Sequence, residues 1–332
     1  MEKEQHELRS YGFFGIFKES FKMVFSWRKI FTQISSAFIL PLCFVFFVHY
    51  HISEALFSKI GYRGFDESDQ LGFPNYSELR HFFVQKWLPY WLFKVAYVFV
   101  LLILSLLSTA AVVYTIACIY TSKSVTFKKV MSVVPKVWKR LLVTFLWSYL
   151  LVFVFIIVTG AMFVLWGSIF ADHVGAIAIV ILVTLLILYL AGLVYITIVW
   201  HLGSVISVLE EVYGIKALKK SRNLLKGKTG VAVALFIVLG AFFGGIQTLY
   251  EILVLQVWPM SMLIKFCVGL ACLLLMVMVV LVGLVVETVL YLVCKSYHHE
   301  TIDKPTLSEQ LEGYNWGYVP LKNNINIQMQ HA

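Results

Sequence analysis

Ionisable side chains inside long apolar stretches are the residues of this sequence best placed to do chemistry. Glu287 lies near the end of one stretch, and Glu251 and Lys265 lie on either side of Trp258. If these stretches cross a membrane, each charge must bind a cation, relay a proton or pair with an opposite charge, because an isolated buried charge is costly. We predict that Glu287 pairs with a basic residue of an interfacial helix and that Glu251 pairs with Lys265. A transport site is the alternative for all three.

Signatures of catalysis are absent from the sequence. It contains no H-E-x-x-H zinc motif, no G-x-S-x-G nucleophile elbow and no P-loop. His298 and Asp303 have the H-x-x-x-x-D spacing of glycerolipid acyltransferases, but the flanking motifs of those enzymes are missing, so we attribute the match to chance. We therefore expect no enzymatic activity, no cofactor and no metal.

The cysteines give neither a disulfide framework nor a metal site. Their number is odd, and all of them lie in or at the edge of apolar runs. Cys294 is a candidate for palmitoylation, although we favour a plain buried or lipid-facing cysteine at this position. The five are Cys43, Cys118, Cys267, Cys272 and Cys294.

Six long apolar runs must position these residues. The chain of 332 residues is 60% hydrophobic and 14% charged, whereas soluble proteins are about half apolar and about a quarter charged. A spanning helix needs roughly 20 apolar residues, and barrel strands would be short and alternating. The sequence therefore predicts an all-α, polytopic transmembrane helix bundle. The predicted spans are 31–50, 95–120, 141–170, 175–201, 231–256 and 262–294.

The segments between the runs alternate between basic and charge-poor. Lysine and arginine cluster before the first run, between the second and third, and between the fourth and fifth, whereas the loop 51–94 balances its charges. Because cytosolic loops are enriched in these residues, we predict six spans with both termini cytosolic. Asn75, in an Asn-Tyr-Ser sequon, is a candidate for glycosylation on the opposite side. The pattern does not distinguish the endoplasmic reticulum or other endomembranes from the plasma membrane.

The three basic segments are amphipathic when drawn as helices. Apolar and basic residues separate over 13–27, 127–140 and 213–226 at about 100° per residue. We predict that each helix lies in the membrane interface before an odd-numbered span, with its apolar face in the acyl boundary, and that Pro135 kinks or divides the second. Anionic lipid, rather than nucleic acid, is then the expected partner. Candidate headgroup-binding residues are Lys18, Lys22, Lys129, Lys136, Arg140, Lys219, Arg222 and Lys226.

An interfacial helix followed by an outward and a returning span occurs three times along the chain. A threefold repeat explains this order about as well as the general tendency of juxtamembrane segments to be basic. Within the spans, Gly240 and Gly244 form a GxxxG pattern, which we expect to pack inside the bundle rather than in a dimer. The sequence does not indicate an oligomer. Pro41 interrupts the first span.

A pattern of small residues in the third basic segment carries a family resemblance. The pattern E-x-x-G-x-x-A-x-x-x-S-x-x-L-x-x-G comprises Glu211, Gly214, Ala217, Ser221, Leu224 and Gly227. It resembles a broad group of six-span membrane proteins that includes the membrane domain of some bacterial glycerophosphodiester phosphodiesterases. The N-terminal blocks Phe13–Phe21 and Ser26–Phe31 are similar to an uncharacterised family of plant multi-pass proteins. The resemblance implies the architecture alone, because the phosphodiesterase domain with its catalytic residues is absent.

The organisation that follows is an interfacial helix in 1–30, a six-span domain in 31–294 and a disordered cytosolic tail in 295–332. The leading hypothesis is a non-enzymatic protein that interacts with lipid or organises the membrane. A small-solute or ion transporter that uses Glu287 is the alternative, and a membrane enzyme of lipid metabolism is the third hypothesis. No feature of the sequence identifies a protein partner.

Overall fold

All the regular structure in the described part of the chain is helical. The computed structural model describes residues 11–50, 52–53, 88–121, 126–170, 175–256 and 261–298. In chain order the elements are α2 (Phe13–Ser26), α3 (Arg28–Ile34), the π-helix η1 (Ser35–Ile39), α6 (Leu88–Tyr120), α7 (Phe127–Phe170), α8 (Ala176–Leu209), α9 (Ile215–Leu224), α10 (Thr229–Tyr250), the π-helix η3 (Glu251–Gln256) and α11 (Met262–Tyr297). Six helices are long and apolar enough to span a membrane, so the predicted all-α class and six spans are confirmed at this level.

The first span contains a local change of helical pitch. The π-helix Ser35–Ile39 interrupts the helical segment Arg28–Tyr50 just before Pro41. Proline has no backbone N–H, and its ring would clash with the carbonyl four residues earlier, here that of Ala37. A π-helical turn widens the helix at that point, so the chain stays helical through the proline.

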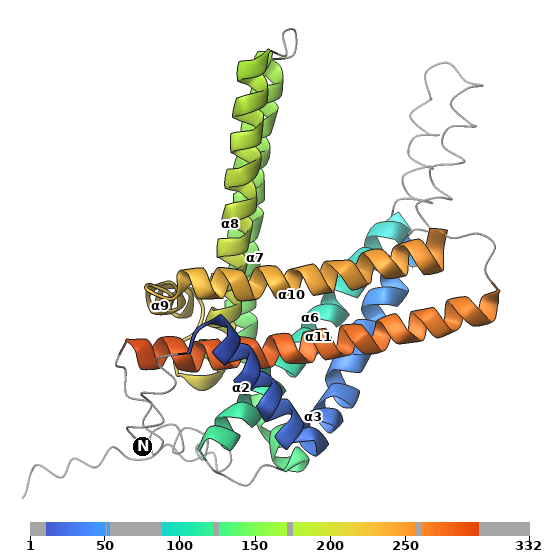
Figure 1. Cartoon of the computed structure of the whole chain (residues 1–332), viewed down its shortest axis with the longest axis vertical. Helices are drawn as coiled ribbons and strands as arrows, with labels where there is room; N and C mark the ends of the chain where they lie inside the picture. The colour runs from blue at the N-terminus through green and yellow to red at the C-terminus, as the bar shows by residue number, and fades with distance from the viewer. Residues whose placement is uncertain are drawn as a thin grey trace, which may run out of the picture.

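Three pairs of long helices build the molecule (Figure 1). The first span runs beside α6, α7 pairs with α8, and α10 pairs with α11. The α7/α8 pair rises out of the body, and the α10/α11 pair crosses below it in this view. Over 149–170 of α7 and 179–197 of α8 every residue remains at least partly exposed, so these portions contact little besides each other. The three pairs therefore diverge from a shared base.

That base holds most of the buried residues. They fall in the second half of α6 (Leu106–Cys118), the beginning of α7 (Val130–Ser148), the end of α8 (Ile198–Leu209) and the second half of α11 (Leu281–Ser296). Helices α2 and α9 pack against these same segments. We call this region, together with α2 and α9, the basic end, because it carries all the lysines and arginines proposed above as headgroup ligands. It contains the beginnings of the odd-numbered spans and the ends of the even-numbered ones.

The amphipathic segments differ from one another in the structure. Helices α2 and α9 are separate elements, but residues 127–140 continue directly into the third span as part of α7, so the predicted division at Pro135 is wrong. The buried residues of α7 keep one helical phase through Pro135, and packing of this continuous face holds the helix together. The apolar face of α9, which includes Ala217 and Leu224, is buried against protein instead of facing the acyl boundary as predicted.

The fourth and sixth spans extend beyond their predicted ends. Helix α8 continues past His201 to Leu209, and α11 continues past Cys294 through three residues that we assigned to the tail. Both extensions lie in the buried base, where tertiary contacts replace lipid as the environment of the helix. The remainder of the predicted tail, 299–332, and the loop residue Asn75 lie outside the described residues.

Candidate functional site at the α8–α9 corner

The carboxylate of Glu210 lies at the centre of a charged cluster that joins three helices. Its Oε1 atom accepts hydrogen bonds from the Tyr291 hydroxyl at 2.7 Å and the Lys295 ammonium at 3.1 Å, both on α11. Its Oε2 atom lies 2.8 Å from the Lys220 ammonium of α9. Only 11% of the Glu210 side chain is exposed. The cluster therefore connects the end of α8 to α9 and to α11.

The electrostatics of this cluster favour the ionised carboxylate. Burial raises the pKa of Glu210, because it removes the charged form from water. Hydrogen bonds from Lys220 and Tyr291 and the charge of Lys295 act in the opposite direction and outweigh burial, so the pKa falls below its ordinary value. At neutral pH two ammonium groups thus face one charged carboxylate.

A second ion pair lies deeper in the base, between α8 and α11. The His201 Nδ1 atom is 3.0 Å from Glu287 Oε1, and the Glu287 side chain is 8% exposed. The rings of Trp200 and Phe236 flank the imidazole, each with its centroid 5.3 Å away. Our prediction of an interfacial basic residue as the partner of Glu287 is therefore wrong. The partner lies on a span, because α8 continues past His201 and keeps that side chain against α11.

A neutral hydrogen-bond network fixes the corner itself. Thr144 of α7 shares a 2.7 Å hydrogen bond with Ser207 of α8, and its Oγ1 atom accepts the backbone N–H of Gly214 at 2.8 Å. Gly214 has φ +65°, a left-handed conformation that glycine adopts without steric cost, and it precedes the first residue of α9. In α9, the Ser221 hydroxyl donates to the Val199 carbonyl at 2.9 Å. These bonds hold α9 against α7 and α8.

The C-terminal end of α9 packs against the C-terminal end of α11. Gly227 has φ +89°, and a Cβ atom there would lie 2.5 Å from the ring of Tyr297. His298 Nε2 lies 3.1 Å from the Leu224 carbonyl and 3.0 Å from that of Lys226. Since carbonyls only accept, Nε2 carries the proton and donates. His298 therefore caps α9, and Asp303 lies outside the described residues.

The small-residue pattern of the third basic segment thus has a structural explanation. Gly214 and Gly227 make the two left-handed turns, while Ala217, Ser221 and Leu224 form the buried face of α9. Glu211, the acidic member, is exposed, and the neighbouring Glu210 makes the ion pairs instead.

The predicted headgroup residues all lie at the basic end, and they differ in how far their side chains are exposed. On α2, Lys18 and Lys22 are exposed, and the Lys22 Nζ atom lies 3.8 Å from the Glu19 Oε2 atom. The remaining members are exposed or half-buried at the start of α7 (Lys129, Lys136 and Arg140) and exposed on α9 (Lys219, Arg222 and Lys226).

The predicted packing role of Gly240 and Gly244 within the bundle is wrong. Neither would bring a Cβ atom within 4 Å of another described element, so both face open space on α10. By contrast, a Cβ atom on Gly203 of α8 would lie 2.8 Å from Leu218 of α9, which identifies Gly203 as the close-packing glycine of the base.

The structure also places three other predicted site residues, Glu251, Lys265 and Cys294, but does not establish their predicted roles. Glu251 begins η3 and Lys265 lies in the first turns of α11, two elements that pack together, and their ion pair stays a prediction. Cys294 is fully buried, which leaves its thiol no room for a palmitoyl chain in this conformation.

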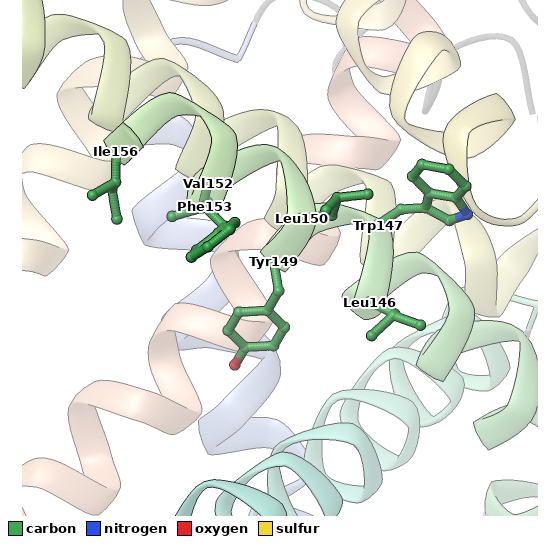
Figure 2. A pocket seen from close by; sticks show the side chains of 7 residues that line it. All are labelled: Leu146, Trp147, Tyr149, Leu150, Val152, Phe153 and Ile156. Carbon is green, nitrogen blue, oxygen red and sulfur yellow. The ribbon is translucent and has the colours of Figure 1, made fainter. Parts of the chain in front are cut away.

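An apolar cleft of about 760 Å³ opens along α7 where this helix leaves the base. Figure 2 shows its lining between Leu146 and Ile156, with the Tyr149 ring directed away from α7 into the space in front of the neighbouring helices. The Tyr149 ring packs against Trp200 with a centroid distance of 5.1 Å. In the described residues, the indole N–H of Trp200 is buried and has no hydrogen-bond partner.

Sequence reasoning missed Glu210, His201, Tyr291 and Lys295. None of these four residues was among the site residues predicted from the sequence. One signal was available for Glu210, because an acidic residue directly after a long apolar helix is at odds with the basic segment around it. Its partners on α11 could not be inferred, because they lie more than eighty positions away in the sequence.

Comparison with known proteins places the chain in a family. A search of curated proteins and a search of solved structures each found no match. A family model described as "Domain of unknown function (DUF8558)" matches residues 1–332. Together with the six candidate spans, this match shows an integral, multi-pass membrane protein that belongs to the DUF8558 family.

Proposed function

We propose that the protein binds anionic lipid at its basic end and organises the surrounding bilayer, without catalysing a reaction. Helix α2 carries this proposal. Its residues Ile16, Ser20 and Val24 are buried, and the helix packs against α11 and α10. Its phenylalanines Phe14 and Phe25 are 83% and 67% exposed. An aromatic surface of this kind is unfavourable in water and suits the headgroup–acyl boundary of a membrane.

The charges of α2 agree with this placement. Lys18 lies within about 60° of Phe14, Phe21 and Phe25 on the helix surface and Lys22 within about 100°, at about 100° per residue. Stacked rings continue the aromatic surface along the helix, with centroid distances of 6.4 Å from Phe17 to Phe21 and 6.5 Å from Phe21 to Phe25. Aromatic rings in the acyl boundary with ammonium groups beside them are the recognition mode for anionic lipid surfaces. The proposal assigns the basic end to the cytosolic side.

Native mass spectrometry of the purified protein in mild detergent tests this function. We expect the wild-type protein to retain anionic phospholipid and the double variant Lys18→Glu, Lys22→Glu to lose it. The matched control Lys94→Glu, Lys265→Glu makes the same charge change on helix segments remote from the basic end and should retain the lipid. Wild-type protein that carries no lipid, or equal loss in both variants, would contradict the proposal.

Transport is a second candidate, supported by the buried pair of His201 and Glu287. An imidazole and a carboxylate that lie 3.0 Å apart between two spans can exchange a proton, which is the chemistry of intramembrane proton relays. Proteoliposomes with an internal pH-sensitive dye test this candidate. Wild-type protein should dissipate a proton gradient and Glu287→Gln should not, while both retain lipid. Equal rates for both proteins would exclude a proton pathway through Glu287.

A further inference from the structure

The cleft along α7 has the shape and the setting of a lipid site. It lies on a candidate membrane span, has a volume of about 760 Å³ and is lined by aliphatic and aromatic side chains. Phe145 and Ser148 are the last buried residues of α7, so the cleft begins where this helix separates from the base. Beyond that point the described residues of α7 are all at least partly exposed, and such side chains on a candidate membrane span are expected to face hydrocarbon.

The inner wall of the cleft is held in place by packed aromatic rings. Tyr149 contacts Trp200, and Trp200 contacts Phe145 in an edge-to-face arrangement with centroids 5.3 Å apart. A Cβ atom on Gly214 would lie 3.3 Å from Trp147, so the start of α9 also adjoins the inner end of the cleft. A preformed wall costs little ordering on binding, which favours a defined occupant over loosely associated lipid.

A cationic surface precedes the cleft on the same side of α7. Lys139 is exposed and lies within about 40° of Leu146 and Leu150 on the helix, at about 100° per residue. The axial separation from Lys139 to Leu150 is about 16 Å, at ~1.5 Å per residue. The half-exposed Val143 lies between them, and the exposed Lys216 lies in the first turn of α9 beside the inner end. Lys139 and Lys216 therefore both belong to segments that adjoin the inner end of the apolar cleft.

We propose that α7 carries a binding site for one anionic phospholipid, with an acyl chain in the cleft and the phosphate between Lys139 and Lys216. The site rests on the proposed lipid-binding function and goes beyond it, because it is separate from the aromatic surface of α2. The apolar lining recognises the chain, and the two ammonium groups select a negatively charged headgroup.

Photo-crosslinking locates the site. The full-length protein in detergent is incubated with phosphatidylglycerol that carries a diazirine on its acyl chain, and the adduct is mapped by peptide mass spectrometry. We expect an adduct within 146–156 that is competed by unlabelled phosphatidylglycerol. Phosphatidylcholine with the same chains should compete on the order of ten-fold less well, because it lacks the net negative charge. Soluble glycerol phosphate should not compete, because it lacks the chain.

Two pairs of variants test the two halves of the site. Leu150→Trp narrows the cleft and should abolish the adduct, whereas Ile187→Trp adds the same side chain to an exposed position of α8 and should not. Lys139→Glu should weaken binding of phosphatidylglycerol on the order of ten-fold, whereas Lys94→Glu on α6, remote from the basic end, should not.

The outcomes separate this site from the general function. An adduct elsewhere, competition by glycerol phosphate, or equal binding by Leu150→Trp and Ile187→Trp would overturn the site. If the α2 double variant still loses retained lipid in that case, the proposed function holds without the α7 site. If the wild-type protein retains no lipid, both proposals fail.

Discussion

The carboxylate of Glu210 and the ammonium of Lys220 lie 2.8 Å apart across the turn between α8 and α9. Because the same carboxylate also binds Tyr291 and Lys295, helix α9 is connected to α11 through one side chain. A change at Glu210 therefore alters how α8, α9 and α11 are held together at the basic end.

Neutralising Glu210 should destabilise the protein. Glu210→Gln keeps the size of the side chain and removes the negative charge that Lys220 and Lys295 share as an acceptor. Hydrogen bonds to charged groups contribute about 1.5–3 kcal/mol, and partial exposure of both lysines reduces this, so we expect a loss of about 1–2 kcal/mol. Thermal unfolding in detergent measures the change. The control is Glu211→Gln at the neighbouring exposed position, and an equal loss there would contradict our explanation.

The stability of the base should depend on pH through the same carboxylate. The pKa of Glu210 is lower in the folded protein than the ordinary glutamate value of 4.5. Its contribution is therefore complete above pH 4.5 and is lost as the pH falls through the lowered pKa. Unfolding midpoints measured between neutral and acidic pH should fall less steeply for Glu210→Gln than for the wild type. Parallel curves would show that other carboxylates cause the acid sensitivity.

Removing one partner of the buried ion pair should cost more than removing both. His201→Phe leaves the Glu287 carboxyl group buried without its hydrogen-bonding partner, a change that costs about 3–5 kcal/mol for a fully buried ion pair and less here, because 35% of the imidazole is exposed. The double variant His201→Phe, Glu287→Leu should recover part of the loss. A double-mutant cycle on thermal unfolding measures the coupling, and additive effects would mean that the two side chains do not interact.

Substitution of the span glycines by alanine should lower the stability at Gly203 and leave it unchanged or slightly raised at Gly240 and Gly244. At Gly203 a Cβ atom would lie 2.8 Å from a terminal methyl of the buried Leu218 side chain, so Gly203→Ala should displace that side chain and lower the unfolding midpoint. Gly240→Ala and Gly244→Ala meet no described neighbour within 4 Å. Both should be neutral, or stabilising by up to about 1 kcal/mol through helix propensity. A fall in the midpoint for Gly240→Ala would show that this face packs against another molecule.

The length of the apolar runs predicted the all-α fold class and the number of spans. This was possible because a helix that crosses a membrane needs one continuous apolar run of sufficient length. Helix ends were predicted less well, since His201 and Cys294 mark where lipid-like composition ends rather than where the helix ends. The apolar face of α9 was assigned to the membrane because periodicity shows that a face will be buried and not what buries it. Glu287 was identified as a residue in need of a partner, but the partner depended on how α8 packs against α11.

The three helix pairs point in different directions from the basic end, so the molecule is compact there and more open farther out (Figure 1). At the basic end the helices pack into one body, whereas farther from it the α7/α8 pair stands apart from the other two pairs. We expect a bilayer that holds a molecule of this shape to place different numbers of lipids around it in its two leaflets. Such an imbalance in leaflet area is a source of spontaneous curvature, which would follow from the shape of the fold even where no individual side chain recognises a lipid.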